Sequence, residues 1–151
     1  MSAVFKQPVS VLVVIHTPAL DVLLLERAES TGLWQSVTGS REGDEHLADT
    51  ALREVAEETG IQASAAALHD WQLANRFLIM QRWRKRYAPG VTQNTEHVFS
   101  LCLPASVPVR LAPDEHTAAR WVPWQEAAQA VFSWTNRDAI HLVARGLSAP
   151  G

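Results

Sequence analysis

Cysteine is nearly absent from this chain, which has 151 residues and one thiol, Cys102. An intrachain disulfide is therefore excluded, and the apolar neighbours of Cys102 predict a structural thiol in a buried strand rather than a nucleophile. A long apolar run is also missing, because the longest one near the start, residues 11–15, is too short to cross a bilayer. Since no secretion-type cleavage pattern follows it, we expect a cytoplasmic protein without a membrane partner.

A strong excess of charge of one sign is missing as well. The chain has 13 basic and 16 acidic residues, for a formal net charge of -3. No global basic field exists to attract nucleic acid, so any anion must bind locally. A short basic cluster at residues 82–87 favours a solvated strand end or a second phosphate-binding arm over an RNA contact. Length and a hydrophobic content of 47% predict one globular domain over residues 1–151, which we expect to be a monomer.

What the chain does contain is one spaced set of residues. Its members are Gly39, Glu45, Arg53, Glu54, Val55, Glu57, Glu58, Gly60 and Ile61. At residue frequencies of roughly 5–7%, chance would align the seven non-aliphatic members in on the order of one chain in a million or fewer. The set is therefore a strong signature, and it is typical of polyphosphate hydrolysis.

The second half of this signature predicts an amphipathic helix over residues 47–59, because apolar residues recur there at three- and four-residue spacings. Gly60 suits a left-handed C-cap, and Asp49 suits the first turn of the helix dipole. Either His46 or Asp44 could serve as the N-cap.

Three carboxylates crowd one face of this helix, at Glu54, Glu57 and Glu58. Arg53 is expected to point about 100° away, so that no cation of the chain offsets their repulsion. A bound Mg²⁺ would offset it, since carboxylate oxygens are ligands that Mg²⁺ prefers. The alternative for an isolated run of glutamates is a solvated acidic face, which the rest of the signature disfavours.

The remaining pattern predicts an α/β domain with a mixed sheet between helices. A turn at residues 17–19 would join the first two strands as a hairpin, residues 34–38 lead into the signature, and Gly146 would follow the last helix. We expect strands over residues 9–15, 22–25, 71–80, 96–103 and 118–122, and further helices over 124–131 and 136–145.

At every position the signature resembles that of the Nudix hydrolase family. The resemblance implies an α/β/α sandwich that cleaves a nucleoside diphosphate linked to another group, with Mg²⁺ as the cofactor. It implies that Glu58, Glu54 and Glu57 hold the metal and that Arg53 orients a glutamate by a bidentate ion pair. Glu54 and Glu57 both remain candidates for the general base.

Outside the signature, local matches resemble a narrower group, the dihydroneopterin triphosphate diphosphatases. The matches lie at Lys6 and Pro8, and at residues 34–40, 86–92, 94–96, 115–116, 133–134 and 136–137. This resemblance implies hydrolysis of dihydroneopterin triphosphate to the monophosphate and pyrophosphate by water, with Glu54, Glu58 and Glu115 as metal ligands. Glu96 is a rival of Glu115 for the distant carboxylate.

The same resemblance implies a set of substrate contacts. They are Lys6, Arg27, Thr38, Phe77, Leu78, Ile79, Met80 and Ser133. Lys6 and Arg27 suit a triphosphate, and residues 77–80 suit an apolar slot for a flat ring, although their alternation fits core packing equally well. Among the six tryptophans, Trp34 and Trp134 are the candidates for stacking on the ring.

Two other functions share the signature. A general Nudix enzyme acting on canonical or oxidised nucleotides, or on capped RNA, would differ in its ring pocket rather than in its metal site. An inactive Nudix-fold ligand sensor would usually lack some signature carboxylates, and all are present here.

Overall fold

The computed structural model describes residues 4–148 of the chain. Its strands are β1 (Val9–His16), β2 (Asp21–Arg27), β3 (Trp34–Gln35), β4 (Val37–Ser40), β5 (Leu68–Leu78), β6 (Gln93–Cys102) and β7 (His116–Pro123). Its α-helices are α1 (Leu47–Thr59), α2 (Trp124–Ala130) and α3 (Trp134–Ser148), and its 3₁₀ helices are η1 (Ala65–Ala67) and η2 (Gln81–Arg86). Among residues 4–148, no helix is both long and apolar enough to cross a membrane.

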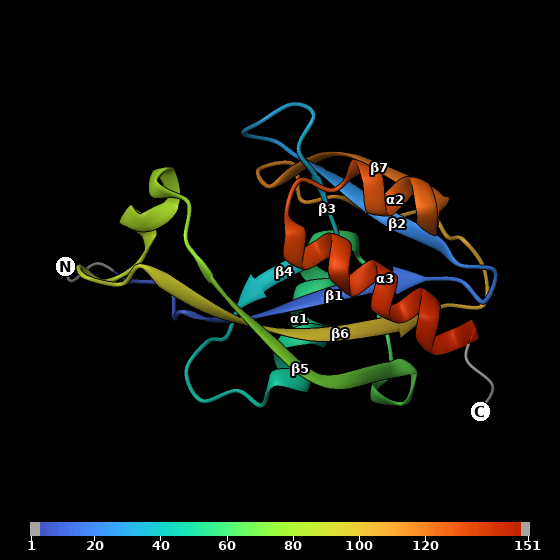
Figure 1. The fold of residues 1–151 in the computed structure, drawn as a ribbon, viewed down its shortest axis with the longest axis horizontal. Helices are drawn as coiled ribbons and strands as arrows, with labels where there is room; N and C mark the ends of the chain where they lie inside the picture. The colour runs from blue at the N-terminus through green and yellow to red at the C-terminus, as the bar shows by residue number, and fades with distance from the viewer. Residues whose placement is uncertain (1–3, 149–151) are drawn as a thin grey trace.

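The strands form one mixed sheet in the order β3-β2-β1-β6-β5, with β4 paired to β1 and β7 paired to β2. The central pair β1 and β6 is parallel, and the other named pairs are antiparallel. Helix α1 covers one face of the sheet, whereas α2 and α3 cover the other (Figure 1). The predicted α/β/α sandwich with a mixed sheet is thereby confirmed.

Strands β1 and β2 form the predicted hairpin but diverge soon after the turn. They pair at His16 and Val22, where the backbone N–H of Asp21 donates to the hydroxyl of Thr17. Further along, β4 pairs with β1 and β3 pairs with β2. The sheet therefore opens between β1 and β2, and the signature enters through β4 at this opening.

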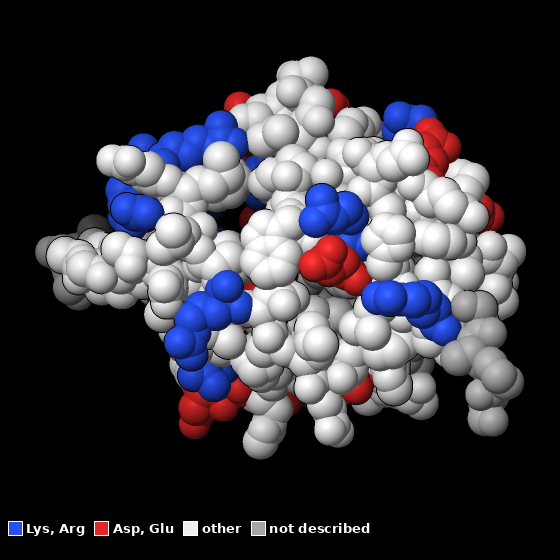
Figure 2. Space-filling view, viewed as in Figure 1, with Lys and Arg blue, Asp and Glu red and all other residues white. Residues whose placement is uncertain are grey.

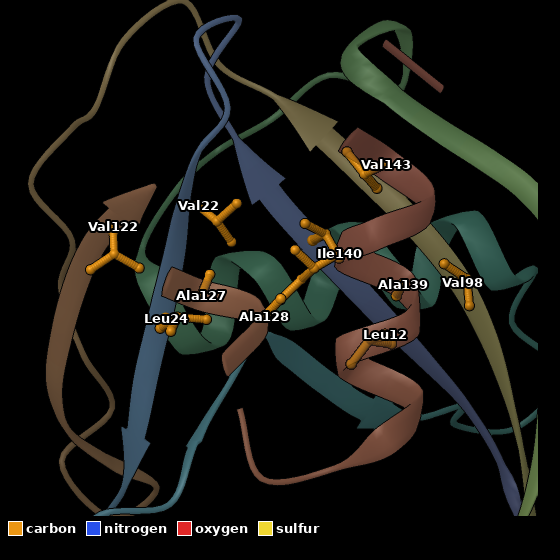
Figure 3. Close-up of a cluster of buried hydrophobic side chains, with 11 residues drawn as sticks. Leu12, Val22, Leu24, Val98, Val122, Ala127, Ala128, Ala139, Ile140 and Val143 are labelled. Atoms are coloured by element: carbon orange, nitrogen blue, oxygen red, sulfur yellow. The ribbon is translucent and has the colours of Figure 1, made fainter. Parts of the chain in front are cut away.

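Alternating residues of β1 supply two separate cores. Leu12 and Val14 pack against α2 and α3 together with Val98 of β6, as Figure 3 shows for Leu12 and Val98. Val11, Val13 and Ile15 pack on the α1 side. A strand buried on both faces reads as a continuous apolar run, which explains why β1 is recognisable in the sequence.

Several local predictions were wrong. Cys102 is exposed, at the last residue of β6, rather than buried within the strand. Gly146 lies inside α3, where a Cβ atom would overlap the ring of Trp71. Residues 81–86 form a 3₁₀ helix rather than a strand end. Residues 79 and 80 follow β5 instead of belonging to it.

Candidate active site

Helix α1 and strand β4 are fitted to each other at the signature glycines. The predicted cap is confirmed at Gly60, whose φ of 75° is left-handed and whose N–H bonds the carbonyl of Ala56. His46 is the N-cap by its backbone, without a side-chain cap. The carboxylate of Glu54 lies against Gly39, where any Cβ atom would overlap it. Gly39 is therefore required so that α1 can bring its acidic face to the opening of the sheet.

Arg53 is the centre of an ion-pair network on α1. Its Nε and Nη2 atoms lie 2.9 Å from the two oxygens of Glu45, which is a bidentate pair. Its Nη1 atom lies 2.7 Å from Glu54 Oε1 and 3.3 Å from Glu57 Oε2. The expectation that no cation of the chain reaches the acidic face was thus wrong, because the long guanidinium side chain curls back over it. Arg53 also donates to the carbonyl of Ser40, which ties α1 to β4.

This network perturbs the ionisation of its members. Hydrogen bonds from Arg53 and the backbone of Glu42 lower the pKa of Glu45 to about 2. Glu57 stays half-exposed at the solvent side of the network. The ion pair with Glu45 thus fixes the guanidinium of Arg53, and Arg53 in turn orients the carboxylate of Glu54.

Glu58 is the most deeply buried acid of the set, with 2% of its surface exposed. Burial, together with the hydrogen bond that its protonated carboxyl donates to Glu54, raises its pKa well above the usual value, and burial also raises the pKa of Glu54. Two adjacent carboxylates that are withdrawn from water share a proton rather than carry two charges. The Oε1 atom of Glu58 has no hydrogen-bond partner among the described residues.

A histidine adjoins this acid, but not as a charged partner. His116 Nε2 lies 3.7 Å from Glu58 Oε1 and 3.2 Å from the amide nitrogen of Gln35. Burial lowers the pKa of His116 to about 4, so its ring is neutral near pH 7. The contact is therefore not an ion pair, and Glu58 retains an unsatisfied buried oxygen.

The acids suit a divalent cation by their chemistry more than by their present spacing. Within residues 4–148, no group of three His, Cys, Asp or Glu side chains is placed so that it could hold a metal ion directly. A bound cation would displace the proton shared by Glu54 and Glu58, and the free Oε1 atom of Glu58 would coordinate it. The charge of Glu115 reaches Glu58, whereas Glu96 is not among the charges that act most on it. Of the two rivals, Glu115 is therefore the better placed.

A cavity of about 680 Å³ opens beside these acids. Its volume lies within the roughly 300–1,000 Å³ that small-molecule sites have. It is lined by Glu58 and Glu115 and by all the predicted substrate contacts, which are Lys6, Arg27, Thr38, Phe77, Leu78, Ile79, Met80 and Ser133. Glu54 lies behind Gly39, which does line the cavity, while Arg53 and Glu57 lie further towards solvent.

One end of the cavity is basic. Lys6 bridges to Tyr87, and its backbone N–H donates to the carbonyl of Arg86. Burial and the nearby charge of Arg86 lower the pKa of Lys6, and the charges of Glu54 and Glu115 oppose that effect. Figure 2 shows Lys and Arg side chains gathered where η2 lies in Figure 1, at the rim of a hollow. An otherwise acidic protein thus places its cations locally, beside the carboxylates.

The cavity also has an aromatic wall beside this basic end, and no spacing along the chain marks its main member, Trp83, as a cavity residue. Trp83 of η2 packs edge-on against Phe132 at 6.1 Å between ring centroids, and Arg27 stacks over it at 4.5 Å. Trp83 also donates to Glu29, which holds Arg27 by an ion pair of 2.6 Å. Of the two tryptophans proposed earlier, Trp134 lines the cavity, whereas Trp34 packs against the core on the α2 side.

The predicted slot at residues 77–80 is only partly core. Leu78 and Met80 are 64% and 45% exposed, so core packing does not explain them, whereas Ile79 is buried. The backbone N–H of Ile79 bonds to the carbonyl of Thr92. These residues form a rim of the cavity rather than a free strand edge.

The fold is a mixed sheet between helices, and its acidic helix α1 packs against Gly39 beside a cavity with basic and aromatic residues. These features define an α/β/α hydrolase for phosphorylated small molecules. The chain belongs to the Nudix family, because the NUDIX domain model matches residues 6–143.

Similar proteins agree with this assignment. The chain is 44% identical over 140 residues to the dihydroneopterin triphosphate diphosphatase of Escherichia coli K12, covering 91% of this chain and 92% of that protein. It is 38% identical over 141 residues to the Haemophilus influenzae protein of the same name, covering 90% and 87%. The solved structure of the E. coli dihydroneopterin triphosphate pyrophosphohydrolase matches with a TM-score of 0.86, over 92% of this chain and 96% of that one.

Proposed function

We propose that this enzyme hydrolyses 7,8-dihydroneopterin triphosphate to dihydroneopterin monophosphate and pyrophosphate. The observation that carries the proposal is a single cavity that joins paired buried carboxylates and a basic end to an apolar and aromatic slot. A flat ring attached to a polyanion needs both halves at once. The 44% identity with a protein named for this activity extends over nearly the whole of both chains.

The divalent cation of the reaction is proposed to be Mg²⁺, held by Glu54, Glu58 and Glu115. Their oxygens suit a hard cation, and the free buried oxygen of Glu58 is the donor that most needs one. Chemistry supplied by the bound ion would be neutralisation of the leaving pyrophosphate and a lowered pKa for a bound water.

Within the acidic set, Glu54 suits the role of proton acceptor better than Glu57. Glu54 lies directly behind Gly39 at the cavity, where a carboxylate can accept the proton of a water beside the phosphates. Glu57 faces solvent with 52% of its side chain exposed. Arg53 acts as a positioning residue, because its Nη1 holds Glu54 Oε1 at 2.7 Å.

The phosphate chain is assigned to Lys6 and Arg27. Arg27 is oriented by Glu29 and by the side-chain oxygen of Gln35, so its guanidinium is fixed before an anion arrives. No described residue clamps the side chain of Lys6 in this way, and an incoming phosphate would raise its lowered pKa again. Thr38 and Ser133 offer hydroxyl groups in the lining of the same cavity.

A substrate panel tests the proposal. Pyrophosphate release is measured with Mg²⁺ for dihydroneopterin triphosphate, for the ordinary nucleoside triphosphates and for oxidised guanine triphosphates at equal concentrations. We expect the highest kcat/KM for the pterin. Preference for any nucleotide by about tenfold, equivalent to about 1.4 kcal/mol, would overturn the pterin assignment in favour of a general nucleotide hydrolase. Replacing Mg²⁺ with Mn²⁺ or Ca²⁺ tests the choice of cation.

A further inference from the structure

Two buried polar side chains face the cavity from β6 and have no role in the reaction described so far. Asn94 and Glu96 alternate along the strand, so both point to the α3 face of the sheet, and both line the cavity. They are only 4% and 5% exposed. Among the described residues, Asn94 Oδ1 and Glu96 Oε1 have no hydrogen-bond partner. Leaving such acceptors unpaired is costly, so these atoms point to a ligand that donates hydrogen bonds.

The remaining polar atoms of this pair are already engaged. The amide nitrogen of Asn94 donates to the hydroxyl of Ser10 at 2.7 Å. Glu96 accepts a hydrogen bond from Thr135, whose hydroxyl lies 3.3 Å from that of Ser133. What faces the cavity is therefore a fixed pair of acceptors without a matching donor.

Their cross-strand neighbours show which part of the cavity they adjoin. Asn94 is the cross-strand partner of Phe77, and Glu96 is that of Asn75. The charges that act most on Glu58 are those of Glu54, Glu115 and Arg27. Asn94 therefore lies beside the ring slot. Glu96 faces the same side two residues further along β6 and is not among the charges that act most on Glu58.

Burial raises the pKa of Glu96 to about 7. A donor placed against its free oxygen would favour the ionised form and lower this pKa. The ionisation of Glu96 is consequently open to control by what occupies the slot.

We propose that Asn94 and Glu96 recognise the donor edge of a 2-amino-4-oxopyrimidine ring, in which a ring N–H stands next to an exocyclic amine. The inference rests on the proposed function and names the residues that select its ring. Pterins and guanine share this edge. Adenine and cytosine place a ring acceptor beside the amine, and hypoxanthine lacks the amine altogether. Two hydrogen-bond acceptors without a donor therefore match the edge of a pterin or of guanine, and not that of adenine, cytosine or hypoxanthine.

Competition experiments test this assignment. GTP, ITP and XTP are used as inhibitors of the hydrolysis of whichever triphosphate the wild-type enzyme cleaves fastest. We expect the wild type to bind GTP about tenfold more tightly than ITP, which differs only in lacking the amine. Equal inhibition by the two would overturn the proposal.

The Glu96→Gln variant is the sharper probe, because it replaces one acceptor oxygen with an N–H donor of the same shape. XTP carries an oxo group where GTP carries the amine, so the ratio of the GTP and XTP inhibition constants should shift towards XTP by roughly 10- to 100-fold. A merely structural glutamate would not exchange one preference for the other. The matched control is Glu126→Gln on the exposed surface of α2, which should leave every ratio unchanged.

A second variant, Asn94→Leu, removes the other acceptor at similar volume. Because Glu96 is matched to the amine, Asn94 is matched to the ring N–H, which GTP, ITP and XTP share. Asn94→Leu should therefore weaken the binding of all three by about tenfold and leave their ratios unchanged. A thermal unfolding scan shows whether the protein remains folded. An unchanged GTP-to-XTP ratio in Glu96→Gln would remove Glu96 from ring recognition. If that variant instead needs more Mg²⁺ for half-saturation, Glu96 belongs to the cation and the proposal is wrong. Failure of the pterin assignment appears separately, as a nucleotide preference in the wild-type panel.

Discussion

At the scale of single residues, Glu58 combines deep burial with a carboxylate oxygen to which none of residues 4–148 donates a hydrogen bond. The Glu58→Gln substitution keeps the shape and removes the charge. We expect turnover to fall by at least about 100-fold, since even groups that only support a metal ligand are worth 10- to 100-fold. The free energy of unfolding in the absence of metal should not fall, because a neutral amide is easier to bury than a carboxylate.

Steady-state kinetics with Mg²⁺ and urea unfolding without it measure the two effects of this substitution. Glu57→Gln is a demanding comparison, because Glu57 belongs to the same network but is half-exposed. It should lose much less activity. Full activity in Glu58→Gln would remove Glu58 from the proposed metal site.

Glu96 predicts a pH dependence of stability. Its pKa is raised to about 7 in the folded protein, from an ordinary value of 4.5. Between these values the folded state holds one more proton than the unfolded state, so the free energy of unfolding falls as pH rises from 4.5 to 7. The loss is on the order of 2 kcal/mol, and the uncharged Glu96→Gln variant should not show it.

Urea unfolding at pH 5 and pH 8 measures this effect, with Glu126→Gln as the control that retains the slope. Other groups titrate in the same interval, so the decisive quantity is the difference between wild type and variant. A difference that does not change with pH would show that Glu96 is ionised freely in the folded protein.

At the scale of elements, the end of α1 depends on one backbone conformation. Gly60 has a φ of 75°, and a Cβ atom there would lie 3.1 Å from the Cβ of Arg110. We expect Gly60→Ala to lower the free energy of unfolding by about 1–2 kcal/mol, from left-handed strain and this close contact. Gly43 has a φ of 57° with nothing within 4 Å, so Gly43→Ala measures the strain alone. Equal losses in both would show that Arg110 simply moves aside.

The elements also show what sequence patterns determine. The bounds of α1 were predicted correctly, because periodicity and a C-cap glycine are local signals. Strand β5 begins at Leu68, earlier than expected, because a bulge near Gln72, with a φ of 53°, breaks the alternation that marks a strand. Trp83 was missed as a cavity residue for a related reason. Its contacts with Arg27 and Phe132 arise from distant segments, and no spacing along the chain records them.

At the scale of the whole molecule, cation binding should stabilise the fold. A ligand that binds only the native state adds about 2.7 kcal/mol at a concentration 100 times its Kd. For a chain of this length, that is a rise in Tm of roughly 5–10 °C with Mg²⁺. Differential scanning calorimetry against Na⁺ at equal ionic strength separates binding from screening. An unchanged midpoint at saturating Mg²⁺ would contradict a site built into the native fold.

The acids of α1 and the proposed ring-binding residues lie on opposite faces of the sheet. The acids of α1 lie on the face that holds Val11 and Val13, whereas Asn94 and Glu96 point to the face of α3, and Glu58, Asn94 and Glu96 line the same cavity. If Asn94 and Glu96 select the ring as proposed, a substitution on the α3 face changes which ring is accepted without changing any residue of α1. In evolutionary terms, this architecture lets substrate choice drift while the hydrolytic apparatus is inherited unchanged.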